Sequence, residues 1–359
     1  GLATIAILSS MVLVTLVGAA SIYAGKKDYI ASVAPHDYSV TGTNVDLTST
    51  QKIMDDFLAQ SGNQVNEKAE VTYLYFGIKE QEKNKLTIFP ENERKVLPKS
   101  IFLVFSQATY KQLTGKDLNL ASNQVGLYSK SKTLKDQKSL SFNGQTYQIQ
   151  DDLNDFIKGK VPNIFTIIVS DYNYLVVPDM DDFKESIKGT ATTQATYVGV
   201  NVKNPTHDAK KNSDLLDQMT DKETQQLAGQ NTGVSQSYLT ANSQYDTEGM
   251  LNGFVGGTLF IGIFLSIIFM LGTVLVIYYK QISEGYEDRE RFVILQKIGL
   301  DDLQVKQTIR KQVLTVFFLP LIFAFIHLAF AYHMLSLIVR IIGVFNQSLM
   351  LVVTIIVCG

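Results

Sequence analysis

Residues that could perform chemistry are sparse in this chain. It has 359 residues, with four histidines and a single cysteine, Cys358. One thiol cannot form a disulfide or a cysteine-based zinc site within the chain, and no H-E-x-x-H spacing offers a histidine-based metal centre. No GxxxxGK[ST] loop is present to bind the phosphates of ATP. The sequence therefore predicts no catalytic, cofactor-binding or metal-binding residue and favours a protein that is not an enzyme.

Lysines form two groups that could contact an anion. Lys26 and Lys27 follow the first apolar run, where they could meet a phosphate-bearing head group or anchor a helix at the membrane surface. A second group either attracts an anionic ligand or lipid, or forms a solvated edge that discourages strand pairing. Its members are Lys130, Lys132, Lys135 and Lys138. The structural role is the preferred interpretation for both groups.

The overall charge argues against nucleic acid as a partner. The formal net charge is −2 and the sequence pI is about 6.1. Proteins that bind nucleic acid need a basic surface to contact phosphates. Only 18% of the residues are charged while 46% are hydrophobic, so the distribution of charge along the chain is the more informative feature.

Long uncharged runs predict membrane helices. Residues 1–25, 249–279 and 312–339 are apolar over the length of about 20 residues that crosses a bilayer. A signal peptide is the alternative for the first run, but it lacks a basic leading segment. A fourth run begins near Leu349 within residues 340–359 and is too short to span. We expect a membrane α-helical protein with four transmembrane helices, the last one truncated, in a fragment of a longer protein.

The distribution of lysine and arginine predicts the topology. Residues 280–311 carry seven basic side chains between two membrane helices, whereas the following connection has only Arg340. Short loops rich in Lys and Arg stay in the cytoplasm. Residues 280–311 are therefore predicted to form a cytoplasmic elbow, and residues 26–248 an inserted extracellular domain.

The predicted extracellular domain mixes strand and helix patterns. Stretches rich in β-branched and aromatic residues predict strands at 71–78, 100–105, 124–129, 165–170 and 195–202. Apolar periodicity predicts helices at 49–61, 180–188 and 208–228. Asn143-Gly144 predicts a hairpin turn because this pair tolerates positive φ. An α+β fold follows, with residues 233–249 as an irregular connection to the membrane. The domain has no cysteine or usable glycosylation sequon, which suggests a bacterial protein.

Several residues in the apolar runs suggest helix packing. Thr258, Gly262 and Ser266 recur at a four-residue spacing that lets helices approach closely. Pro320 interrupts the third run, and proline is tolerated there when neighbouring helices compensate. His327 lies well inside that run. An intramembrane histidine can serve a proton relay, but a neutral packing role is the preferred interpretation.

The predicted cytoplasmic elbow has an amphipathic pattern. Phe292, Leu295 and Ile298 form one apolar stripe within a charged stretch. Gly299 is placed to end this helix, and a second short helix is expected to begin at Asp301 or Asp302. The apolar face fits either a partner groove or the inner leaflet of the membrane.

Two sequence patterns in this chain resemble a known family. They are E-G-Y-E-D-R-x-R-F-x-I-L-x-x-I-G at 284–299 and F-F-x-P-L-x-x-A-x-x-H-x-x-F-A at 317–331. Both resemble FtsX-like permeases of ABC transporters, and most of all the C-terminal half of the BceB type of Gram-positive bacteria. The resemblance implies ten membrane helices with a large extracellular domain between the seventh and eighth, of which this chain would supply the last four.

The resemblance also implies a function and partners. Such permeases sit in the cell membrane and pair with a separate ABC ATPase dimer, which binds the ATP and Mg. They help cells resist bacitracin and other antimicrobial peptides that bind lipid-linked cell-wall precursors, by export or target protection, and signal to a membrane histidine kinase. With this family in mind, we expect the charged rim and apolar stripe to contact the ATPase through Glu284, Tyr286, Asp288, Arg289, Phe292, Leu295 and Gly299.

Two alternatives from other classes stay open at this point. One is a non-transporting FtsX-type regulator or sensor of cell-wall hydrolases. The other is a MacB-type efflux permease, whose extracellular domain lies between its first and second helices and whose ATPase is fused to it. The pattern at 317–331 favours the BceB type over the MacB type.

Overall fold

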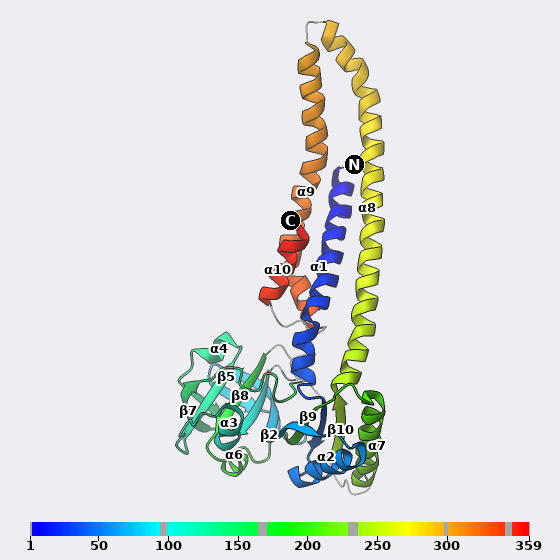
Figure 1. The fold of residues 1–359 in the computed structure, drawn as a ribbon. Helices are drawn as coiled ribbons and strands as arrows, with labels where there is room; N and C mark the ends of the chain where they lie inside the picture. Colours follow the sequence, from blue (N-terminus) through cyan, green and yellow to red (C-terminus); the bar gives the residue numbers. More distant parts are fainter. Residues whose placement is uncertain are drawn as a thin grey trace. The chain divides into compact units, whose positions relative to one another are not determined.

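The computed structural model describes residues 2–93, 98, 100–163, 171–228, 236–297, 301–341 and 347–358. The chain divides into a helical unit, Gly1–Asp28 with Leu251–Gly359, and a domain, Tyr29–Met250 (Figure 1). Two helices, α1 (Leu2–Val33) and α8 (Gln244–Lys297), have residues in both. Each unit is described by itself.

The helical unit contains most of α1 and α8, together with α9 (Asp302–Ile341) and α10 (Gln347–Cys358). α1, α8 and α9 are long and apolar enough to cross a membrane. Three of the four predicted membrane helices are therefore confirmed at this level. α10 has 12 residues, about 18 Å of helix, which is short of the roughly 30 Å of a bilayer core.

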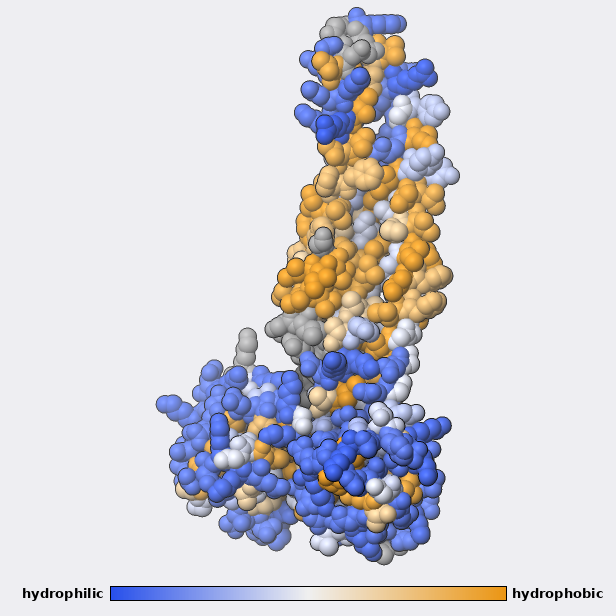
Figure 2. All heavy atoms as spheres, in the orientation of Figure 1, coloured by the Kyte–Doolittle hydropathy of each residue, from blue (hydrophilic) through white to orange (hydrophobic). Residues whose placement is uncertain are grey.

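Apolar contacts hold the helical unit together. A buried cluster joins Val17 and Ile22 of α1 to Val255 of α8 and Leu328 and Leu335 of α9. Apolar side chains cover the outer sides of these helices, whereas hydrophilic ones gather where α8 leads into α9 (Figure 2). Such an apolar outer surface is what a helix needs in contact with lipid or with further membrane helices.

The domain is built on one sheet of ten strands. The strands are β1 (Tyr38–Thr43), β2 (Val65–Glu82), β3 (Lys85–Ile88), β4 (Ser100–Ser106), β5 (Gln124–Ser129), β6 (Ser139–Phe142), β7 (Gln145–Asp152), β8 (Asp171–Val177), β9 (Thr192–Val202) and β10 (Tyr238–Ser243). Their order is β10-β1-β9-β2-β3-β6-β7-β5-β8-β4, and β2 also pairs with β4. This extra pairing closes the last seven strands, β2 to β4 in that order, into a barrel. The α+β prediction is confirmed. The sequence patterns did not predict the barrel.

The barrel strands bury both of their faces. In β4, Phe102 and Val104 belong to one apolar cluster, and Ile101, Leu103 and Phe105 to another. The first cluster receives side chains from all seven barrel strands and so fills the interior. The second lies on the outer face, under α3 (Gln107–Thr114) and residues 153–161. The alternation follows from the two-residue period of a strand. Two short helices, α4 (Lys132–Lys135) and α6 (Met180–Ser186), complete this part.

The remaining strands carry a helical layer. α2 (Leu47–Ser61) and α7 (Ala209–Ala228) pack on β1, β9 and β10 around Met54, Phe57 and Leu216. Asp46 caps α2 by accepting from Ser49 N at 2.9 Å, and Gly62 ends it with a left-handed φ of 68°. These are ordinary helix start and stop signals.

Most of the predicted elements are confirmed. The strands expected at 71–78, 100–105, 124–129 and 195–202 lie within β2, β4, β5 and β9, and the helices expected at 49–61, 180–188 and 208–228 correspond to α2, α6 and α7. Asn143 and Gly144 have φ values of 51° and 88° between β6 and β7, as the hairpin prediction requires. The strand expected at 165–170 lies outside the described residues.

The irregular connection expected at 233–249 is wrong where the structure describes it. β10 occupies Tyr238–Ser243 and pairs with β1, and α8 begins at Gln244. The sequence of β10 is polar and has no apolar pattern that would predict a strand. Its strand structure depends on pairing with β1.

Candidate functional site

The main candidate site is a groove in the hairpin that α8 and α9 form. We define the α8–α9 hairpin as residues 280–297 and 302–316. Its groove has a volume of about 390 Å³. Gln281, Glu284, Gly285, Asp288, Arg289, Phe292 and Val293 line it from α8, and Val305, Ile309, Gln312, Val313 and Val316 from α9. Four of the seven residues that the sequence suggested for ATPase contact therefore lie together in one groove.

The two long helices position this groove. α8 continues without a break from the apolar run to Lys297, so the first half of the predicted elbow is the end of a membrane helix. α9 begins at Asp302, where Asp301 O accepts from Gln304 N and Val305 N. The start of α9 matches the position predicted for a second helix, but α9 has 40 residues and is not short. The helix end predicted at Gly299 lies outside the described residues.

The groove has an apolar floor and a polar rim. Val305 and Val316 are buried, and Phe292 is half-buried. Gly285 has open space where a side chain would project, which keeps the groove wide on the α8 side. Such a combination of an apolar floor and a polar rim suits a protein partner that inserts apolar side chains.

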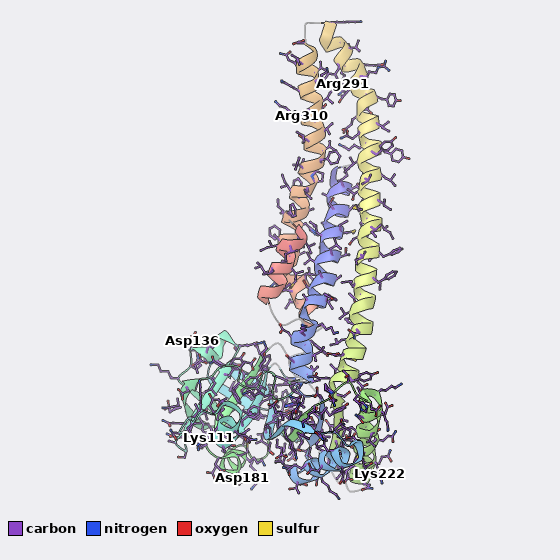
Figure 3. The ribbon with its side chains drawn as sticks, in the orientation of Figure 1. Lys111, Asp136, Asp181, Lys222, Arg291 and Arg310 are labelled. Carbon is purple, nitrogen blue, oxygen red and sulfur yellow. The ribbon has the colours of Figure 1, made fainter. Side chains whose placement is uncertain are left out.

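Ionic contacts hold the rim in place. Lys280 Nζ lies 2.7 Å from Glu284 Oε1, one turn apart on α8. Asp288 accepts a hydrogen bond of 3.3 Å from Gln312 of α9 and lies 3.5 Å from Arg291 Nη1. Asp288 thereby links the two helices across the groove. Arg291 on α8 and Arg310 on α9 give the hairpin the basic character used to predict its topology (Figure 3).

Of the other three residues suggested for ATPase contact, Tyr286 does not line the groove. Tyr286 is on α8 with 73% of its surface exposed. Leu295 is on the last turns of α8. Gly299 lies outside the described residues. The α9 side of the groove was only partly anticipated, because Val313 and Val316 were assigned to the membrane run. The spacing of Val305, Ile309, Val313 and Val316 is the helical signal that could have found it.

The small residues of α8 lie where α1 approaches. A side chain on Gly262 would meet Ala19 Cβ at 2.7 Å. Ser266 Oγ lies 2.8 Å from Thr15 Oγ1, and it donates to Gly262 O at 2.7 Å. Thr258 is half-buried on the same helix. This arrangement permits the close helix approach that small residues allow.

The two special residues of α9 have different surroundings. Pro320 is buried inside the helix. His327 is exposed, whereas its neighbour Leu328 belongs to the buried cluster. His327 therefore does not contribute to the packing among α1, α8 and α9, and its role stays a prediction.

The lysines suggested for anion contact do not form one site. Lys26 donates to Asn252 Oδ1 within the helical unit, and Lys27 is exposed. In the domain, Lys130 Nζ lies 4.4 Å from the ring centroid of Tyr172, a cation–π contact. Lys135 and Lys138 are exposed near α4, and Lys132 starts that helix.

A buried carboxyl group lies beside Lys130. Burial raises the pKa of Asp155, and the charge of Lys130 and a hydrogen bond from Tyr174 offset this in part. One carboxylate oxygen of Asp155 is buried without a hydrogen-bond partner among the described residues. Tyr128 and Tyr174 stack 4.8 Å apart at this position. Lys130 therefore has a structural role within the domain, through its contacts with Tyr172 and Asp155.

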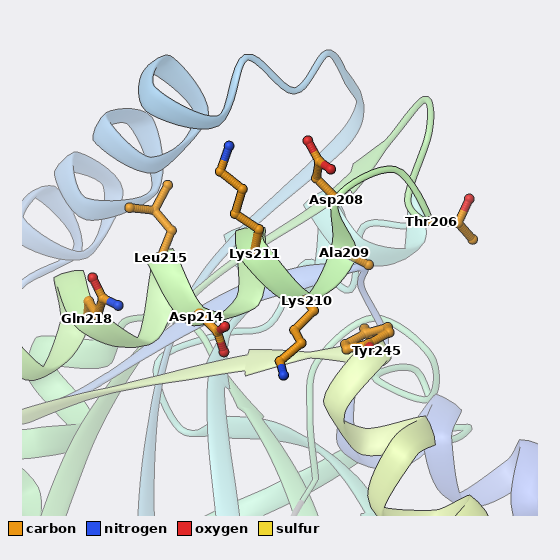
Figure 4. Close-up of a pocket in the computed structure, with 9 residues that line it drawn as sticks. All are labelled: Thr206, Asp208, Ala209, Lys210, Lys211, Asp214, Leu215, Gln218 and Tyr245. Atoms are coloured by element: carbon orange, nitrogen blue, oxygen red, sulfur yellow. The ribbon is translucent and has the colours of Figure 1, made fainter.

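A second hollow lies on the domain at the start of α7. It has a volume of about 720 Å³ and is lined by Thr206, Asp208, Ala209, Lys210, Lys211, Asp214, Leu215, Gln218 and Tyr245 (Figure 4). Lys210 extends to the side of α7 where Tyr245 lies, and Lys211 extends to the opposite side. The formal charges of its two lysines and two aspartates cancel. Within the described ranges, no group of three His, Cys, Asp or Glu residues could hold a metal ion.

Part of the chain is similar to known bacterial proteins. The chain is 35% identical over 79 residues to the ABC transporter permease protein YxdM of Bacillus subtilis, a stretch that covers 22% of this chain and 13% of the relative. It is 28% identical over 138 residues to the bacitracin export permease protein BceB of the same organism, covering 38% and 19%. Over these stretches the chain is similar to ABC transporter permeases. A third similarity, 33% over 78 residues, is to the uncharacterized ABC transporter permease YvcS. No protein-family model matches the sequence.

These similarities cover only a small part of each relative's length. The matches cover 13%, 19% and 12% of the three relatives, so this chain aligns with less than a fifth of the length of each. With three helices that could span a bilayer, it is a multi-pass membrane protein.

Proposed function

We propose that this chain is part of the permease subunit of an ABC transporter that protects a bacterial cell against antimicrobial peptides, by exporting them or by freeing their lipid-linked cell-wall targets. The similarity to a bacitracin export permease supports this proposal. The chain would perform no covalent chemistry, and ATP and Mg would bind to a separate ATPase dimer. A membrane histidine kinase would be a further partner that reads the transporter's activity.

The observation that carries the proposal is the groove of the α8–α9 hairpin. It combines Glu284, Asp288, Arg289 and Phe292 with an apolar floor from α9. An ATPase that changes shape on binding ATP needs a firm contact through which to move the membrane helices. A groove formed by two such helices meets that need, because a partner seated in it contacts α8 and α9 at once.

The decisive test is Phe292→Asp in the full permease expressed with its ATPase. A carboxylate in the apolar part of the groove would be buried without a partner when the ATPase docks, so we expect ATPase co-purification to be lost. Ile294→Asp is the matched control, because Ile294 is 61% exposed on α8 and does not line the groove. Equal recovery of the ATPase with both variants would remove the groove as the docking site.

Peptide resistance needs its own readout. Cells that carry Phe292→Asp should become as sensitive to bacitracin as cells without the permease, while Ile294→Asp should preserve resistance. If wild-type permease gives no protection against bacitracin or related peptides, the peptide part of the proposal is wrong and the ATPase contact stands by itself.

A further inference from the structure

The end of α1 within the domain is capped by residues from distant parts of the chain. The last carbonyl groups of a helix have no partner inside it and must find one elsewhere. Three consecutive carbonyls here each accept one bond. Asn163 N donates to Ser32 O at 2.8 Å, Asn242 Nδ2 to Val33 O at 3.0 Å, and Gln244 Nε2 to Ala34 O at 3.0 Å. The last turn is therefore attached to the domain at three points.

One of these residues also contacts the other helix that enters the domain. Asn242 is the penultimate residue of β10. Its amide nitrogen donates to Val33 O at the end of α1, and its Oδ1 accepts from Thr247 Oγ1 at 3.0 Å in the first turn of α8. Thr247 is 8% exposed, so its hydroxyl group is shielded from competing water. The Asn242 side chain thus bonds both the end of α1 and the first turn of α8, beside the direct bond from Gln244 of α8 to Ala34 O.

The strands on either side strengthen this connection. Gln244 N donates to Asp37 O at 3.0 Å, and the carboxylate of Asp37 accepts from Val202 N at 2.8 Å. The α8 start is also capped, because Asp246 N donates to Ser243 Oγ at 3.1 Å. The start of α8 is therefore bonded to Asp37, the residue before β1, and Asp37 is bonded in turn to the last residue of β9.

We propose that Asn242 is a coupling residue that makes the end of α1 and the start of α8 move as one body with β10. A displacement of either helix end would then pass to the other and to the sheet, instead of being absorbed by a flexible joint. The connection between the two helix ends follows from the hydrogen bonds above. The idea that it carries ATP-driven helix movement to the domain rests on the proposed function.

Hydrogen exchange on the full chain in lipid nanodiscs tests the joint directly. Asn242→Leu removes both bonds of the side chain, and we expect amide exchange to rise about tenfold in residues 30–34 and in the first turn of α8, since a factor of ten corresponds to roughly one hydrogen bond. Asn204→Leu is the matched control, because Asn204 is exposed in the same domain. It should leave both segments unchanged.

Thr247→Val separates a bridge from two independent caps. This variant has nearly the same shape, retains the fold, and removes only the hydroxyl that orients Asn242. If Asn242 is a bridge, exchange rises in residues 30–34 of α1, which Thr247 does not bond. A rise confined to α8, or no change in either segment with Asn242→Leu, would overturn the proposal. No ATPase or peptide is present in this experiment, so the result stands whether or not the proposed function holds.

Discussion

Asp155 shows how a single buried charge can lower the stability of the domain. Its carboxyl group lies at the edge of the outer barrel core, near Tyr128, Tyr174 and the ammonium group of Lys130. Burial raises its pKa, so the folded state binds a proton more readily than the unfolded state does. Between the two pKa values stability falls as pH rises, and the loss persists at neutral pH.

Replacement of this carboxyl group should therefore stabilise the protein. We expect Asp155→Asn to raise the melting temperature at pH 7.5, because the amide has a similar shape and no charge to bury. The gain should shrink as the pH falls toward 5, where more of the wild-type carboxyl is protonated. Thermal unfolding in detergent at several pH values measures this. Asp152→Asn, at an exposed position, should change little, and a gain that is independent of pH would contradict the titration argument.

Gly262 shows the opposite case, where the absence of a side chain matters. An added Cβ would lie 2.7 Å from Ala19 Cβ, closer than these atoms can approach, and a tight 3.3 Å from Thr15 O. We expect Gly262→Ala to separate α1 from α8 at a cost of about 1–3 kcal/mol, the usual cost of overpacking. Gly257→Ala on the same helix has nothing within 4 Å and should be neutral or stabilising, since alanine favours helix. Thermal unfolding of both variants in detergent decides this, and equal effects would refute the close contact.

At the scale of elements, the sequence predicts apolar strands well. It predicts poorly those strands that depend on hydrogen bonds to neighbouring strands distant in sequence. β5 matches its predicted bounds of 124–129. β8 was missed because Asp171 and Asn173 interrupt its apolar pattern. Asn173 is nevertheless buried, where it accepts from Ser129 Oγ at 2.6 Å and donates to Ser100 Oγ at 2.7 Å. Those partners lie in β5 and β4, and no local signal reveals them.

The same limit applies to the closure of the barrel and to the candidate site. The parallel pairs β4–β8, β3–β6 and β5–β7 join segments distant in sequence, which periodicity cannot assign. In the hairpin, the stripe containing Phe292 was visible as an amphipathic pattern. Val313 and Val316 were not, because an apolar residue beside a membrane run looks like part of that run.

The hairpin between β6 and β7 gives a test of local structure. Gly144 has a φ of 88°, a left-handed value that side chains with a Cβ rarely adopt. Gly144→Ala should destabilise the protein by about 1 kcal/mol. Gly144→Asn should cost less, because asparagine tolerates positive φ better. Chemical unfolding followed by tyrosine fluorescence compares the two, and identical losses would show that the turn conformation is not what limits stability.

At the scale of the whole molecule, the two units have surfaces of different character. The helical unit exposes large apolar side chains along α8 and α9, including Phe260, Phe264 and Phe330. In the domain, the buried clusters hold the large apolar residues, and the exposed residues are mostly polar. A bilayer therefore fits around the helical unit, with the basic α8–α9 hairpin on one side. The positive-inside rule then predicts that this hairpin lies in the cytoplasm.

Cysteine labelling in intact cells tests that orientation. In a Cys358→Ser background, Lys222→Cys places a thiol on exposed α7 of the domain, and Arg310→Cys places one on the exposed side of α9 in the hairpin (Figure 3). A membrane-impermeant maleimide should label the first thiol in intact cells and the second only after permeabilisation. Arg310 is one of seven basic residues that fix the prediction, so its replacement alone should leave the topology unchanged. The reverse labelling pattern would place the hairpin outside, where no cytoplasmic ATPase could reach its groove, and both the topology and the proposed docking site would then be wrong.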